Sequence, residues 1–164
     1  MRTTKYLILS LFLSVALTVA LGSQPEARAA APTEIAIVVN SSNPINALSL
    51  SDLRKIYMGE RVYWKTNSPV LLLMRSSGSR ERDVILRVVY QMTEQQYTQY
   101  WVAKVMRAEA SDPPAILYSL GMVLEGVKGS PGAIGYLDSR DVRPGMKVLR
   151  IDGFLPGEAG YPLR

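Results

Sequence analysis

Residues 69–90 read PVLLLMRSSGSRERDVILRVVY and join three kinds of pattern in one run. The continuously apolar residues 70–74 predict a short strand that is covered on both faces. The polar residues 75–79 have the composition of a turn followed by a helix N-cap. Beyond them, apolar side chains recur at helical spacing, at Val84, Ile85, Val88 and Val89. The run therefore predicts a strand, a turn and a helix whose first amides face the turn.

The turn has the composition of an anion-binding site. The first N–H groups of a helix lack internal partners and carry about half a positive charge, which favours phosphate, sulfate or carboxylate there. Gly78 allows close approach of the backbone, and Arg75 can form a bidentate, charge-assisted contact. Arg80 and Arg82 oppose the helix dipole unless an anion is bound. The candidate ligands are Arg75, Ser76, Ser77, Gly78, Ser79 and Arg80.

Two other interpretations remain open. In the first, the turn is only solvated, and Glu81 and Asp83 balance the arginines beside them. The second concerns the polar loop after residues 34–39, which form another predicted strand. Its residues Asn40, Ser41 and Ser42 are secondary donors if the strands at 34–39 and 70–74 are parallel, because both loops then lie at the ligand-binding edge of one sheet. An ordinary turn is the favoured interpretation of that loop.

The rest of the chain continues the alternation of strands and helices. The other predicted elements are a helix that starts after Ser49 and stops near Gly59, a helix with capping-box spacing at Thr93 and Gln96, a helix from Asp112 to Gly129, and strands at 133–137 and 147–151. This order predicts an α/β fold, with a mixed sheet flanked by helices. Tyr97, Tyr100 and Trp101 recur at helical spacing and are expected in the core. Gly135, inside a strand, indicates close approach of another backbone.

The chain of 164 residues is the size of about one domain, behind an N-terminal segment typical of a secretory signal peptide. That segment has a basic start, an apolar run at 6–21 and small residues at 27–31; an uncleaved membrane anchor is the less favoured alternative. We predict a signal peptide at 1–31, one domain at 32–151 and a mobile tail at 152–164, where glycine and proline are frequent. The expected location is periplasmic or secreted.

Composition narrows the functions that the chain can have. It contains no histidine and no cysteine, which excludes disulfides and removes the common nucleophilic triads and most zinc sites. We therefore predict no enzyme activity, no metal and no cofactor. The formal net charge of +5 is mild; it suits a small anion or an acidic partner and is poor support for nucleic-acid binding.

Three motifs together resemble a known family. They are SLSDLRKIYMGERVYW at 49–64, MRSSGSRERDVI at 74–85 and GSPGAIGYL at 129–137. Their order and spacing are similar to those of the phosphate-binding receptors of ABC transporters, in the type 2 periplasmic-binding-protein superfamily. The resemblance covers about residues 35–137.

The resemblance implies binding of phosphate or a related oxyanion, and association with an ABC transporter permease or another envelope protein. Arg75 and Ser79 match the family's phosphate-binding arginine and serine, whereas Arg80 and Glu81 stand where the family has glycine and threonine. The chain is much shorter than the classical receptors, which implies a single-lobe, reduced member; a homodimer is one way to complete a cleft. The alternative is a single-lobe envelope module that has lost the ligand and binds a protein partner, such as a sensor or a secretion component.

Overall fold

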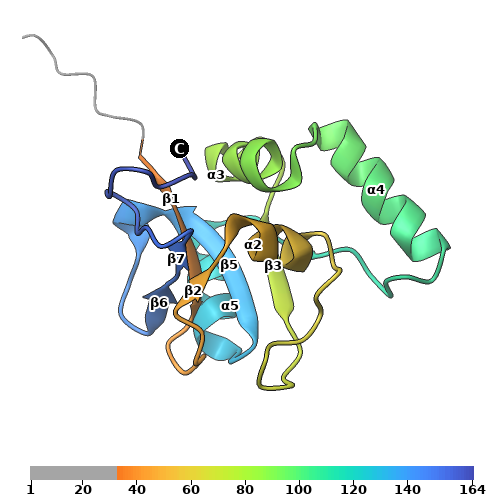
Figure 1. Ribbon diagram of the computed structural model, residues 1–164. Helices are drawn as coiled ribbons and strands as arrows, with labels where there is room; N and C mark the ends of the chain where they lie inside the picture. Colours follow the sequence, from red (N-terminus) through yellow and green to blue (C-terminus); the bar gives the residue numbers. More distant parts are fainter. Residues whose placement is uncertain (1–32) are drawn as a thin grey trace, which may run out of the picture. The chain divides into compact units, whose positions relative to one another are not determined.

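The computed structural model describes residues 33–164 and shows an α/β domain built on one mixed sheet (Figure 1). The predicted signal peptide lies outside the described residues. The sheet has the strand order β4-β3-β5-β1-β6, and its strands are β1 (Ile35–Asn40), β3 (Leu71–Arg75), β4 (Ala115–Leu117), β5 (Ala133–Asp138) and β6 (Met146–Val148). A separate parallel pair is formed by β2 (Ala47–Leu48) and β7 (Arg150–Ile151).

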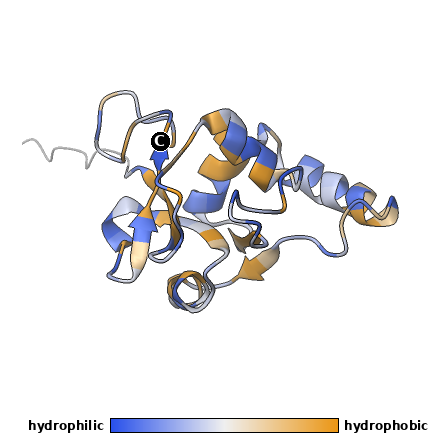
Figure 2. Ribbon diagram, turned by 60° about the horizontal axis from the view of Figure 1, so that its bottom comes forward, coloured by the Kyte–Doolittle hydropathy of each residue, from blue (hydrophilic) through white to orange (hydrophobic). Residues whose placement is uncertain are grey.

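Helices cover both faces of the sheet, as predicted. The helical segments are α2 (Leu50–Tyr57), α3 (Arg80–Ile85), the π-helix η1 (Leu86–Tyr90), α4 (Glu94–Met106), α5 (Leu120–Gly129) and the short 3-10 turn η2 (Ser139–Asp141). On one face, Ile35, Ile37 and Val39 of β1 pack with α2 and η1, and on the other, Ala36 and Val38 pack with α5. Figure 2 shows the hydrophobic residues gathered in this interior. No helix among residues 33–164 is long and apolar enough to cross a membrane.

Strand direction decides which loops share an edge of the sheet. Strands β3, β4 and β5 are parallel, but β1 is antiparallel to both of its neighbours, β5 and β6. The carboxyl ends of β3, β4 and β5 therefore lie beside the amino end of β1. The two polar loops were expected to lie together only if the strands at 34–39 and 70–74 were parallel. The two strands are antiparallel, so the loops lie at opposite ends of the sheet.

The predicted helix from Asp112 to Gly129 starts too early. Ile116 and Leu117, which fitted its apolar face, belong to β4 and pair with Met74 and Arg75 of β3. Helix α5 begins only after Ser119, whose hydroxyl accepts the Met122 N–H at 3.2 Å. Pairing with a buried strand outweighs the helical periodicity of so short a run.

Several local predictions are confirmed. Ser49 caps α2, Gly59 ends it with φ of +65°, and Thr93 and Gln96 form a capping box at the start of α4. Tyr97 and Trp101 are core residues, each 5% exposed. The predicted strand at 147–151 is divided between β6 and β7, because Leu149 bonds to Ile37 between them.

The segment at 152–164, predicted as a mobile tail, packs against β1. Tyr161 and Leu163 are buried in the core. The Ile35 N–H donates to the backbone oxygen of Leu163 at 2.9 Å, and the Tyr161 hydroxyl donates to the Ile35 oxygen at 2.6 Å. The segment forms no helix or strand, so its sequence shows no periodicity. The buried side chains of Tyr161 and Leu163 anchor it to the core.

Candidate functional site

The turn at 75–80 leaves β3 at the carboxyl edge of the three parallel strands. The Ser76 N–H donates to Leu117, the last residue of β4, at 3.0 Å. From the other side, the Arg80 guanidinium bonds to the Thr33 oxygen and lies 3.6 Å from the carboxylate of Asp138, the last residue of β5. The turn is therefore held by both neighbouring strands.

The turn presents several unused backbone donors. Gly78 has φ of +81°, which reverses the chain, and the Ser79 hydroxyl caps α3 by accepting the Arg82 N–H at 3.3 Å. Within the described part of the chain, no hydrogen bond is formed by the backbone N–H groups of Ser77, Gly78, Arg80 and Glu81. These N–H groups lie around the start of α3, where an anion is favoured.

Arg75 combines a fixed backbone with a free side-chain donor. Its N–H donates to the Tyr136 hydroxyl at 2.9 Å, and its carbonyl oxygen accepts from Arg82 at 2.7 Å. Its Nη1 atom is buried and has no hydrogen-bond partner among residues 33–164. A buried cationic nitrogen without an acceptor is costly, so Arg75 is the side chain in the turn that most needs an anionic partner.

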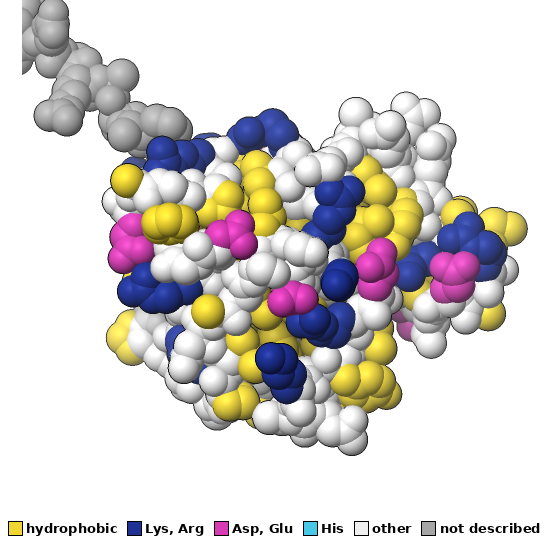
Figure 3. All heavy atoms as spheres, in the orientation of Figure 1, with side chains coloured by type: hydrophobic (Ala, Val, Ile, Leu, Met, Phe, Trp, Pro, Cys, Tyr) yellow, Lys and Arg dark blue, Asp and Glu magenta, His cyan; other side chains and the backbone are white. Residues whose placement is uncertain are grey.

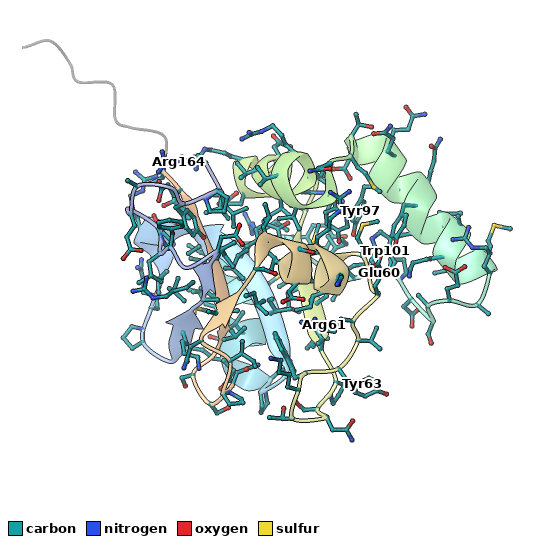
Figure 4. The ribbon with its side chains drawn as sticks, viewed as in Figure 1. Glu60, Arg61, Tyr63, Tyr97, Trp101 and Arg164 are labelled. Carbon is teal, nitrogen blue, oxygen red and sulfur yellow. The ribbon has the colours of Figure 1, made fainter. Side chains whose placement is uncertain are left out.

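Arg82 fits neither of the two predicted interpretations. It is only 3% exposed, and its guanidinium makes a two-pronged contact with Glu94 of α4, at 2.8 and 2.7 Å. It also lies over the Tyr97 ring, 4.5 Å from its centre (Figure 4, where Tyr97 lies on the inner side of α4). Burial alone would lower the pKa of Arg82, but the hydrogen bond and charge of Glu94 raise it. Arg82 is thus a buried structural cation whose partner lies in the next helix.

Asp138 is a carboxylate held between two arginines. Burial alone would raise its pKa, but hydrogen bonds from the side chain and backbone of Arg140 outweigh burial and lower the pKa to about 2. Arg80, whose side chain is 44% exposed, makes the looser contact. Since Arg80 is held by Asp138 and Thr33, it would have to exchange partners to contact an anion.

The lowered pKa of Asp138 predicts a loss of stability in acid. A carboxylate with a pKa of about 2 when folded and about 3.8 when unfolded stabilises the protein above pH 4, and this contribution disappears as the pH falls towards 2. We expect Asp138→Asn to reduce the acid-dependent loss of unfolding free energy between pH 5 and pH 2.5 by about 1–2 kcal/mol. Urea unfolding at the two pH values measures this, with the exposed Asp112→Asn as control. Equal losses in wild type and Asp138→Asn would contradict the prediction.

The predicted secondary donors do not join the turn. Asn40 ends β1 at the opposite edge of the sheet, because β1 runs against β3. Its amide nitrogen donates to the backbone oxygens of Val127 and Lys128, at 3.0 and 2.7 Å, and its oxygen accepts from the backbone and hydroxyl of Ser42. The loop of Asn40, Ser41 and Ser42 therefore ties β1 to the end of α5, and we drop it from the site.

A groove of about 440 Å³ lies away from the turn, between the α2–β3 connection and residues 109–115. Its walls include Ile56, Leu72 and Trp101. Its charged residues are two acids, Glu109 and Asp112, and Arg61, which is already paired with Asp52 at 2.6 Å. Hydrophobic side chains gather beside α4 on this face (Figure 3). An apolar groove of this kind does not suit a small oxyanion, so we place the anion site at the turn.

Sequence reasoning found the turn but missed the residues that hold it. Tyr136 and Asp138 come from β5, and Glu94 from α4. Tyr136 stands in one of the three family-like motifs, which was a signal available in the sequence. Among residues 33–164, no group of acidic or other ligating side chains could hold a metal ion.

A family model described as the PBP superfamily domain matches residues 27–152, most of the chain. The chain belongs to the PBP superfamily. The fold agrees with solved PBP-like structures. One, from Clostridium perfringens, is described as a phosphate ABC transporter substrate-binding protein with bound phosphate; it is 23% identical, with a TM-score of 0.62 over 76% of this chain and 47% of that one.

Two further solved structures have the same relation to this PBP-superfamily chain. An ABC-type phosphate transport receptor from Vibrio cholerae is 19% identical, with a TM-score of 0.61 over 76% of this chain and 48% of that one. PstS from Borrelia burgdorferi is 17% identical, with a TM-score of 0.62 over 80% of this chain and 54% of that one. At these identities the likeness shows the fold alone. The chain spans about half the length of the structures that it matches.

Proposed function

We propose that the chain binds phosphate or a related oxyanion at the Arg75–Arg80 turn, as a solute-binding protein associated with an ABC transporter. The observation that carries this proposal is the buried Nη1 atom of Arg75, which lacks an acceptor among the described residues. Unused backbone N–H groups lie in the same turn, so an oxyanion there could accept from both kinds of donor. The names of the solved PBP-like structures, one of them with bound phosphate, support the choice of ligand.

The location and partners of the protein follow from the same proposal. The basic and apolar N-terminal pattern supports export to the periplasm or secretion, where a solute-binding protein meets its ligand. An ABC transporter permease is then the natural protein partner. A homodimer that builds one cleft from two chains also belongs to this proposal. No catalytic activity is needed for the role.

Arg75→Ala tests the site. We expect this substitution to reduce phosphate affinity by at least about tenfold, because a charge-assisted hydrogen bond to the anion is lost. Titration calorimetry of wild type and variant in phosphate, sulfate and chloride at matched ionic strength measures it. Arg107→Ala, which removes an exposed arginine outside the turn, is the matched control. Unchanged phosphate affinity in Arg75→Ala would remove the turn from the binding site.

A second candidate function is favoured by the groove. Val62, Tyr63 and Leu71 are exposed at 52%, 55% and 41%, and Val62 and Leu71 line the groove. Exposed apolar side chains around a groove are typical of protein contact sites. In this alternative the chain is a single-lobe module that binds a sensor or secretion component. No anion would then raise the melting temperature, whereas a ligand at 100 times its dissociation constant adds about 2.7 kcal/mol to the unfolding free energy.

A further inference from the structure

Arg82 connects the proposed anion-binding residue to α4. Its Nε and Nη2 atoms donate to the two carboxylate oxygens of Glu94, at 2.8 and 2.7 Å, and its Nη1 atom donates to the backbone oxygen of Arg75 at 2.7 Å. The Arg82 side chain is 4% exposed. All three nitrogen atoms of the guanidinium thus have a protein partner, and Arg82 is not available to a dissolved anion.

The peptide group that Arg82 holds is the end of β3. On the amino side of the same residue, the Arg75 N–H donates to the Tyr136 hydroxyl of β5 at 2.9 Å. Arg75 is therefore fixed through its N–H and its carbonyl oxygen, by two side chains from different elements. A backbone fixed in this way sets the position and direction from which the Arg75 side chain starts, so less backbone freedom is lost when the side chain binds a ligand.

Helix α4 in turn fixes the Arg82 side chain. Glu94 is the first residue of α4, where a carboxylate is favoured by the helix dipole, and the capping box of Thr93 and Gln96 holds that end of the helix. One turn later, Tyr97 places its ring under the guanidinium. Burial raises the pKa of Tyr97 to about 12, so the ring stays neutral at physiological pH.

We propose that Arg82, held by Glu94 and Tyr97, is a positioning residue that presents the Arg75 side chain to the anion. The inference rests on the proposed function. It assigns Arg82, in the first turn of α3, a role that its place in the sequence did not predict. The geometry requires a planar guanidinium, since one group must serve two carboxylate oxygens and a carbonyl oxygen at once. A lysine keeps the charge but cannot make these three contacts.

Phosphate titrations of Arg82→Lys and Tyr100→Phe test this role. Tyr100→Phe is the matched control, because it removes another anchor of α4, the 2.7 Å bond from the Tyr100 hydroxyl to the Met58 oxygen, without touching Arg75. Both variants are measured at a temperature where urea unfolding shows them to be folded. We expect Arg82→Lys to bind phosphate about 10- to 100-fold more weakly than wild type, and Tyr100→Phe to stay within about twofold.

The NMR signal of the Arg75 side-chain Nε–Hε group reports anion contact directly, and a general loss of stability in a folded variant does not change it. On addition of phosphate at one fixed concentration, we expect this signal to shift in wild type and Tyr100→Phe and not in Arg82→Lys. If Arg82→Lys does not fold, Glu94→Gln carries the same expectation. Wild-type protein that binds no anion would overturn the proposed function itself. Wild-type binding with equal affinity in the folded Arg82 or Glu94 variant would overturn only the positioning role.

Discussion

Replacing Gly132 by alanine is expected to destabilise the protein by about 3 kcal/mol or more. A Cβ atom at this position would lie 2.2 Å from the backbone oxygen of Pro69, far inside contact distance. The Gly132 oxygen also accepts the Leu71 N–H at 3.0 Å and the Trp64 indole N–H at 2.9 Å. The obstacle is backbone rather than a flexible side chain, so relieving the overlap would pull β3 away from the start of β5.

The urea midpoints of Gly132→Ala and Gly129→Ala measure this effect. Gly129 is a matched control, because a Cβ atom there meets nothing within 4 Å and the residue ends α5. Alanine at Gly129 should be neutral or slightly stabilising. A midpoint for Gly132→Ala equal to that of Gly129→Ala would show that the two strands can separate at this point without cost. The prediction that another backbone approaches Gly135 is wrong, because the atom nearest to a Cβ at that position belongs to the Val127 side chain, at 3.3 Å.

Deleting residues 161–164 is expected to cost about 3–6 kcal/mol of unfolding free energy. The deletion exposes the core surface covered by Tyr161 and Leu163, which are 2% and 0% exposed, and burial of each such side chain contributes about 1.5–3 kcal/mol. It also removes both hydrogen bonds to the backbone of Ile35. Strand β1 would keep its pairing with β5 and lose these two additional bonds at its amino end.

Denaturant unfolding of the shortened chain and of Arg164→Ala separates these contributions. Arg164 is 53% exposed and makes a surface ion pair with Glu34 at 2.9 Å, which typically contributes less than about 1 kcal/mol. Arg164→Ala should therefore remain close to wild type while the deletion unfolds at much lower urea. If the deletion leaves the urea midpoint unchanged, the segment does not stabilise the fold, and the prediction of a mobile tail at 152–164 would be correct after all.

The elements that could be predicted from sequence are those fixed by neighbours along the chain. Helix α2 has its cap, its apolar face and its terminal glycine within residues 49–59, and these signals act locally. Strand β4 has only three residues, and its pairing with β3 decides its conformation. The direction of β1 depends on its pairing with β5 and β6, far along the chain, which periodicity cannot report.

The candidate site divides in the same way. The polar turn after a buried strand was visible because Arg75, Gly78 and Ser79 are adjacent in sequence. The partner of Arg82 could not be predicted from the sequence. A bound anion or the neighbouring acids Glu81 and Asp83 could each have balanced its charge, but the carboxylate that binds it lies in the next helix. A buried arginine is identified by what surrounds it in three dimensions.

The pairing of β1 also has a consequence for how the chain folds. Ile35 pairs with Asp138, and Asn40 pairs with Met146, so the first strand has no partner in the sheet until most of the chain exists. A ribosome that adds about 5–20 residues per second needs roughly 5–20 s to make the intervening stretch. During that interval a strand that is apolar from Ile35 to Val39 stays unpaired, and loop closure over such a distance slows the final step. Closure of the central sheet is therefore a late event, because β1 can join it only after the residues of β5 and β6 have been made.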